Sequence, residues 1–132
     1  MKEIIISTSC KTEWVATEDK LACTVGSGKA RVFATPMLCA LMENAAMNCI
    51  ESFLEGDETT VGTYIAIDHT SATPCGMKVW AEATVTAVNG REICFEVKAY
   101  DECGEIGKAE HKRFVVYAQK FQQKADSKGK NC

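Results

Sequence analysis

The stretch FATPMLCALMENAAMNCIESFL, residues 33–54, decides the fold, because it predicts one long helix that is apolar over most of its surface. Thr35 and Pro36 make a favourable helix start, since a threonine hydroxyl can cap the first amides and proline suits the first turn. At about 100° per residue, the polar side chains form one narrow stripe, made of Asn44, Asn48, Glu51, Ser52 and Glu55. Such a helix must be covered by other structure on nearly every side.

One carboxylate of this helix, Glu43, lies outside the polar stripe, roughly 100° from its centre. The residues three and four positions away are Cys39, Ala40, Ala46 and Met47, none of which is charged. An acid in apolar surroundings is costly unless it has a partner. Glu43 is therefore the first candidate for a functional residue.

Composition narrows the class of protein. The 132 residues are 46% hydrophobic and 25% charged, which suits one globular domain, 1–132. The net charge of −3 gives no reason to expect a nucleic acid partner. No apolar run approaches the roughly 20 residues of a membrane span, and the three-isoleucine core of MKEIIISTSC is too short for a signal peptide. We therefore expect a cytoplasmic protein that binds neither nucleic acid nor membrane.

The eight cysteines, of which the last is Cys132, contain no Cys-x-x-Cys pair. That spacing is typical of zinc sites, and with only two histidines present no metal site is expected. Cys39 and Cys49 fall inside the predicted helix, and no secretory signal precedes them, which argues against a disulfide framework. The cysteines are interpreted as free thiols that act as small hydrophobic residues.

After the helix, the hydrophobic period changes from 3.6 to 2 and predicts four strands, at 60–69, 78–88, 91–100 and 105–117. Asn89-Gly90 is a strong hairpin signal between the second and third. Upstream, 2–8 and 11–17 are predicted to be strand, 18–30 a short helical turn with a loop, and 118–132 a C-terminal helix. In the first strand after the helix, the alternation predicts that five side chains share one face: Val61, Thr63, Ile65, Ile67 and His69.

The predicted order is strand, long helix, then a four-stranded antiparallel meander. It favours an α+β fold of the hot-dog type, with a long central helix wrapped by a curved antiparallel sheet of five to six strands. One sheet covers only one side of so apolar a helix. We therefore expect a homodimer, or a higher oligomer, in which two sheets pair edge to edge.

Three residues of this arrangement could form a site: Thr35 at the helix start, Glu43 just over two turns later, and His69 at the end of a strand. Each also has an ordinary structural explanation, as a helix cap, a buried acid or a hydrogen-bonded strand end. Glu43 needs a partner, and His69 is the only inward-facing candidate that the meander offers before Arg113.

Four motifs together resemble the hot-dog thioesterase family that includes fluoroacetyl-CoA thioesterase: VGSG at 25–28, FATPMLCALMENAA at 33–46, TTVGTYIAIDHTSATPCGMKV at 59–79 and HKRFVV at 111–116. The resemblance covers about residues 12–117. It implies hydrolysis of an acyl-CoA by a Thr-Glu-His constellation, which falls on Thr35, Glu43 and His69. It also assigns Gly62 and Arg113 to the substrate site, where we add Phe33.

The resemblance further implies an acyl-CoA substrate and no cofactor apart from the coenzyme A of that substrate. Glu43 would activate water or attack the thioester itself, while His69 would orient Glu43 or the water and protonate the leaving thiolate. The Thr35 hydroxyl would hold the carboxylate or the carbonyl oxygen, with amide donors near the helix start contributing to the oxyanion site. The segment CTVGSGKAR, residues 23–31, contains no aromatic residue, so a small or short-chain acyl group is expected and no fluorinated one is implied.

Two other functions fit the same fold, because a fold alone does not fix function. One is a non-catalytic module that binds acyl-CoA or an acyl carrier. The other is a hydratase, although the Asp/His loop pair of such an enzyme is not apparent. The tail lysines 120, 124, 128 and 130 would suit coenzyme A phosphates, but a solvated terminal helix is the better explanation of them.

Overall fold

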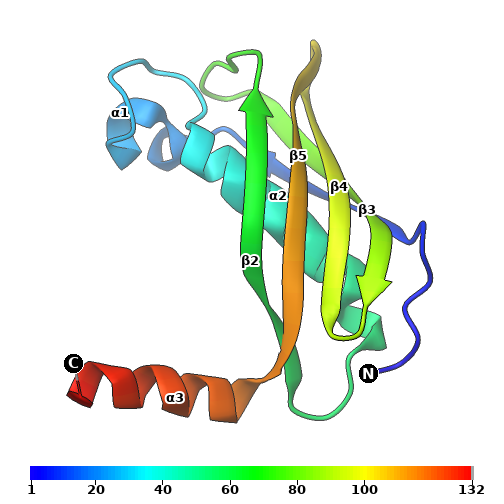
Figure 1. Cartoon of the computed structure of the whole chain (residues 1–132). Helices are drawn as coiled ribbons and strands as arrows, with labels where there is room; N and C mark the ends of the chain where they lie inside the picture. The colour runs from blue at the N-terminus through cyan, green and yellow to red at the C-terminus, as the bar shows by residue number, and fades with distance from the viewer. Residues whose placement is uncertain (132) are drawn as a thin grey trace.

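The computed structural model describes residues 1–131, so Cys132 lies outside the described residues. Figure 1 shows one curved antiparallel sheet with a long helix, α2, running behind it. The strands are β1 (Ser9–Val15), β2 (Glu58–His69), β3 (Lys78–Asn89), β4 (Glu92–Asp101) and β5 (Gly104–Tyr117). The helices are α1 (Ala22–Val25), α2 (Thr35–Ile50) and α3 (Ala118–Asn131), with short 3₁₀ turns at Glu18–Lys20 and Glu51–Phe53.

The strand order in the sheet is β1-β3-β4-β5-β2. The predicted four-stranded meander is therefore wrong, because only β3, β4 and β5 follow one another in space. β2 pairs with β5, and β1 takes the place beside β3 that a meander would give to β2. Alternation of side chains predicts a strand but not its neighbour, which explains the error. Residues 2–8 also form no strand. As a result, β2 is an edge strand.

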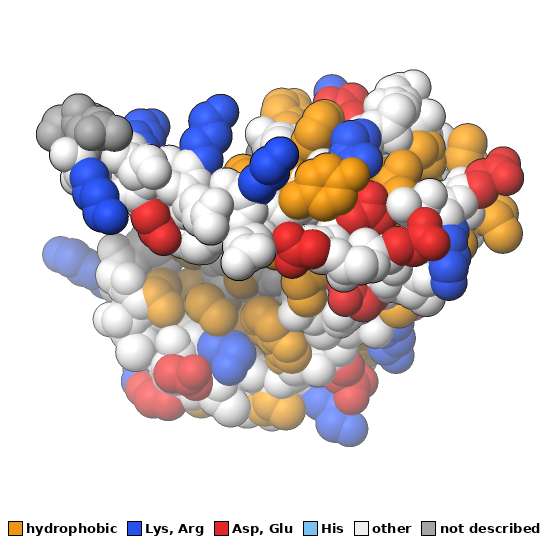
Figure 2. Space-filling view, turned by 90° about the horizontal axis from the view of Figure 1, so that it is seen from below, with side chains coloured by type: hydrophobic (Ala, Val, Ile, Leu, Met, Phe, Trp, Pro, Cys, Tyr) orange, Lys and Arg blue, Asp and Glu red, His pale blue; other side chains and the backbone are white. Residues whose placement is uncertain are grey.

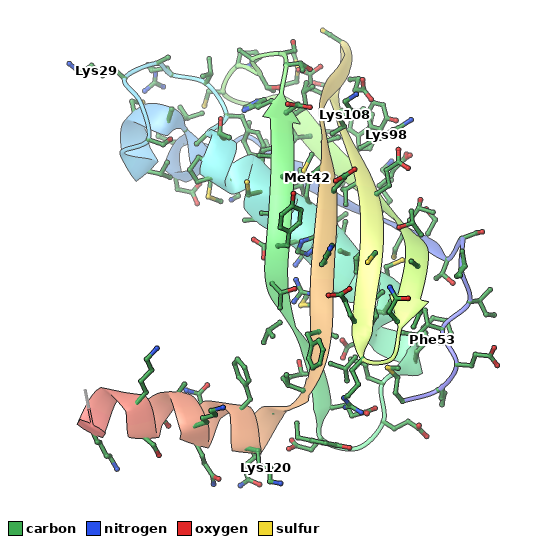
Figure 3. All side chains as sticks on the ribbon, in the orientation of Figure 1. Lys29, Met42, Phe53, Lys98, Lys108 and Lys120 are labelled. Carbon is green, nitrogen blue, oxygen red and sulfur yellow. The ribbon has the colours of Figure 1, made fainter. Side chains whose placement is uncertain are left out.

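The core lies between α2 and the concave inner face of the sheet. Leu38, Leu41 and Met42 of α2 are fully buried, and Figure 3 shows Met42 on the helix behind the strands. Opposite them, the sheet presents small side chains such as Ala81 and Ala83, which let the helix approach the strands closely. This arrangement confirms the predicted α+β architecture of a long helix wrapped by one antiparallel sheet.

An irregularity in β2 changes which of its side chains face the helix. The register with β5 shifts between Gly62 and Tyr64, as in a β-bulge. Gly62 is therefore opposite Arg113, and Ile65 is opposite His111. Both of these pairs lie on the inner face of the sheet. The predicted common face holds for Ile65, Ile67 and His69. For Val61 and Thr63 the prediction is wrong, because the extra residue of the bulge interrupts the alternation.

The C-terminal helix α3 is anchored at its start and projects past β2, away from the sheet (Figure 1). Seen from below, the surface carries several Lys and Arg side chains at the end of the chain where α3 lies (Figure 2). The Ala118 N–H donates to the Asp57 carbonyl at 2.9 Å, and the side chains from Gln119 to Lys130 are exposed. Within residues 1–131, no helix has the length and apolar character needed to cross a membrane.

Candidate active site

The end of β2 and the start of α2 bring two of the predicted site residues together. The Thr35 Oγ1 lies 2.7 Å from the Nδ1 of His69, which is a short hydrogen bond. The N-cap residue of α2 is Ala34, and Thr35 is the first residue of the helix. No side-chain capping hydrogen bond is present at this helix start. The predicted capping role of Thr35 is therefore wrong, because its hydroxyl is committed to the imidazole of His69.

The imidazole of His69 is held neutral by its surroundings. Burial lowers the pKa of His69, since a charged ring would lose its hydration there. The Nε2 is buried and has no hydrogen-bond partner among the described residues. A buried ring nitrogen without a partner is less costly as a lone pair than as an N–H. A ring with its proton on Nδ1 would donate to the Thr35 hydroxyl and leave the hydroxyl proton free.

Glu43 is placed differently from the prediction. Its side chain is 43% exposed, and its nearest cation is Arg113, with the Nη1 3.9 Å from the Oε2. Along the helix, Glu43 lies eight residues beyond Thr35, or about 12 Å at roughly 1.5 Å per residue. Within one chain, Glu43 is therefore no partner of His69. It is open because this flank of α2 lies beside the edge strand β2, where the sheet ends.

Gly62 lies directly against the carboxylate of Glu43. A Cβ atom at this position would lie 2.8 Å from the Glu43 Oε2 and 3.3 Å from the Cε1 of His111. Carbon atoms do not approach an oxygen that closely, so any side chain here would displace the carboxylate. The absence of a side chain at Gly62 is thus a condition for the observed position of Glu43.

Arg113 connects this carboxylate to the sheet. Its guanidinium is buried and donates from Nε to the Thr60 hydroxyl at 2.9 Å and from Nη2 to the Thr60 carbonyl at 3.1 Å. The Nη1 also lies 3.3 Å from the Nε2 of His111. Burial lowers the pKa of Arg113, although Glu43 partly offsets this effect. Sequence reasoning did not propose Thr60 or His111 for the site.

Phe33, a predicted substrate-binding residue, is almost fully buried, and its ring borders a pocket of about 260 Å³. Thr35 and His69 line the same pocket, and so do small side chains such as Ala22 and Ala72. A larger hollow of about 740 Å³ lies over the outer side of the strands and touches neither Thr35 nor Glu43. Because Thr35 and His69 line the smaller pocket, it is the better candidate for the substrate site.

The seven described cysteines are free thiols, as predicted. Cys39 lies one turn before Glu43 on the same flank of α2. Burial raises the pKa of its thiol, and the neighbouring carboxylate adds to this effect. A thiol of raised pKa is a poor nucleophile at neutral pH, so Glu43 is the better candidate on this flank.

Comparisons with known proteins agree with this architecture. The model of the fluoroacetyl-CoA-specific thioesterase family matches residues 16–119. The chain is 39% identical to the fluoroacetyl-CoA thioesterase of Streptantibioticus cattleyicolor over 74% of its own length and 70% of that protein.

Two solved structures are similar over nearly the whole fold. A variant of the fluoroacetyl-CoA-specific thioesterase in complex with fluoroacetate and CoA has a TM-score of 0.85 at 31% identity, covering 89% of this chain and 99% of that one. A thioesterase superfamily member from Thermus thermophilus has a TM-score of 0.91 at 25% identity, covering 99% and 97%. These likenesses support the predicted hot-dog fold.

Proposed function

Because this chain belongs to the fluoroacetyl-CoA-specific thioesterase family, a family of thioester hydrolases, we propose that it hydrolyses a small or short-chain acyl-CoA. The products are the carboxylic acid and free coenzyme A, and no cofactor is needed beyond the coenzyme A of the substrate. A relative of the same family binds fluoroacetate and CoA, which supports this class of substrate.

The proposal rests on the electrostatic and hydrogen-bonding surroundings of the Glu43 carboxylate. Arg113 lies close enough to stabilise its charge, but at 3.9 Å it makes no hydrogen bond to it. No hydrogen bond to this carboxylate is present among the residues that the structure describes. An acid that is charge-stabilised, half-exposed and free of hydrogen bonds can accept a proton from water or attack a carbonyl carbon.

We propose that the full site forms between two copies of the chain. β2 is an edge strand, and a two-fold axis can pair it with the same strand of a partner. In an antiparallel pair, the Glu58 end of one strand lies beside the His69 end of the other. Glu43 packs against Gly62 of β2, so this pairing brings it toward the Thr35–His69 pair of the second copy. The partner also covers the apolar flank around Met47.

In this site, Glu43, Thr35 and His69 have different roles. Glu43 takes a proton from water as the water oxygen adds to the thioester carbon, or it adds to that carbon itself and is released by water afterwards. The hydroxyl of Thr35 donates to the carbonyl oxygen as negative charge develops there. When the carbon–sulfur bond breaks, the thiolate takes the proton that Glu43 accepted from water, which returns Glu43 to the carboxylate; where Glu43 itself has added to the carbon, the thiolate takes a proton from solvent. His69 holds the Thr35 hydroxyl in place through their hydrogen bond.

Release of free thiol from acetyl-, propionyl-, butyryl- and longer acyl-CoAs tests the activity. We expect turnover that declines as the acyl chain lengthens, since the pocket beside Thr35 holds only about 260 Å³. Binding of acyl-CoA without release of thiol would identify a non-catalytic binding module instead. Formation of a hydrated acyl-CoA would identify a hydratase.

Sedimentation of the purified protein tests the shared site. We expect a species of twice the 14.4 kDa chain mass at micromolar concentration. Met47→Lys, on the exposed flank beside Glu43, should weaken both the dimer and turnover, whereas Ile5→Lys, at another exposed apolar residue, should change neither. An active folded monomer would contradict the shared site while leaving hydrolysis itself established.

A further inference from the structure

His111 is a buried histidine to which the proposed reaction assigns no role. It lies in β5 and is 1% exposed. Its ring stacks on Phe95 of β4, with centroids 5.9 Å apart. A buried histidine on an inner sheet face can serve packing alone, so its hydrogen bonds must decide whether it does more.

Both ring nitrogens of His111 have a defined partner. The Nδ1 lies 2.8 Å from the carbonyl oxygen of Tyr64, which can only accept, so the proton is on Nδ1. The Nε2 then carries a lone pair, and it faces the Nη1 of Arg113 at 3.3 Å. Burial lowers the pKa of His111 and so favours the neutral ring that this arrangement requires.

The hydrogen bonds of Arg113 divide into two groups. Thr60 receives the Nε and Nη2 donors, which fixes one side of the guanidinium to β2. The Nη1, which is the atom nearest Glu43, has His111 as its hydrogen-bond acceptor. Because the guanidinium is rigid and planar, the bonds to Thr60 set its plane, and the lone pair of His111 supplies the further hydrogen bond at the atom beside Glu43.

We propose that His111 is a positioning residue for the hydrolysis, which holds the Nη1 of Arg113 beside the carboxylate of Glu43. This inference rests on the proposed function, because it assumes that Glu43 reacts. The charged groups that face His111 are Arg113 of its own strand and Glu43 of α2. β2 contributes the Tyr64 carbonyl and Gly62, and β4 contributes the ring of Phe95.

The experiment compares three substitutions. His111→Phe keeps a ring over Phe95 but removes the acceptor, so kcat should fall about tenfold or more while KM stays nearly unchanged. His111→Gln restores both a donor and an acceptor and should recover most of kcat. Phe95→Leu, the packing control, loses the stacked ring but keeps the hydrogen bonds and should keep kcat.

A second measurement does not depend on activity. In NMR spectra of ¹⁵N-labelled protein, the Nη1 protons of Arg113 should exchange slowly with water in the original chain and in His111→Gln, and faster in His111→Phe. Should His111→Phe fail to fold, His111→Met removes the acceptor with a flexible side chain of similar length.

The outcomes separate the two proposals. Loss of kcat and faster exchange in the Phe variant, both restored by Gln, support the positioning role. Equal losses in the Phe, Gln and Phe95→Leu variants, or unchanged kcat and exchange in His111→Phe, would overturn it. If the original chain releases no thiol from any acyl-CoA, the proposed function fails, while the exchange rates still decide whether His111 holds Arg113.

Discussion

The hydroxyl of Thr35 and the imidazole of His69 form a 2.7 Å hydrogen bond across 34 positions of the chain. Because this hydroxyl does not cap α2 but pairs with His69, Thr35→Ala should lower the free energy of unfolding by about 1 kcal/mol, the cost of one lost hydrogen bond. Turnover should fall, since the oxygen of the substrate loses its donor. Thr35→Ser, which keeps the hydroxyl, should retain most activity. Chemical denaturation and thiol release measure both effects, and a loss of stability in Thr35→Ala well above that of one hydrogen bond would restore the capping explanation.

Glu43→Gln should fold normally and lose turnover by about 10²–10⁴, the range typical of a lost general base. The side chain is 43% exposed, so the amide should leave the free energy of unfolding within about 0.5 kcal/mol of the original. Glu51→Gln, an exposed acid just after the same helix, is the matched control and should keep full activity. If Glu43→Gln hydrolyses acyl-CoA at the rate of the unsubstituted protein, Glu43 is a surface acid without a catalytic role.

Gly62→Ala should impair turnover more than stability. The new methyl would lie 2.8 Å from the Oε2 of Glu43, and the flexible carboxylate can move away at little cost in folding energy. Its new position would no longer be the reactive one. Gly129→Ala, in α3, meets no atom within 4 Å and serves as the control. Equal kcat in both alanine variants would show that the close contact at Gly62 has no functional meaning.

The two histidines predict how stability depends on pH. Burial lowers the pKa of both His69 and His111 from the ordinary value of 6.5. The unfolded chain then binds protons that the folded chain does not, so stability is complete above about 6.5 and falls as pH decreases through the lowered values. Urea titrations between pH 7.5 and 5 should show this decline. His111→Gln cannot titrate and should make the slope shallower, and an unchanged slope would exclude His111 as a contributor.

The helix and most strands were predictable because their patterns are local. The apolar stretch with Thr35-Pro36 at its start gave the position of α2, and alternation gave the existence of β2 to β5. Strand neighbours were not predictable in this way. The place of β2 at the edge depends on β1 and on the packing of the whole sheet, which no alternation encodes.

Glu43 shows how much of the candidate site could be predicted from the sequence and how much could not. Its unusual position on the helix could be recognised from periodicity, but its partner could not, because the bulge at Gly62 decides what faces it. His111 could have been found, since it lies two residues before Arg113 on a predicted strand and alternation places both on one face. Its role required the hydrogen bonds to Tyr64 and Arg113, which depend on distant parts of the chain.

The position of Cys49 between α2 and the sheet makes this thiol an internal reporter of opening. It is 5% exposed, its Sγ lies 3.2 Å from the Thr8 carbonyl, and burial raises its pKa to about 11. Cys23, Cys75 and Cys103 are exposed and should react with an aromatic disulfide reagent at once. Cys49 should react only when the helix separates from the strands, so the rate of its modification measures how often the native core comes apart.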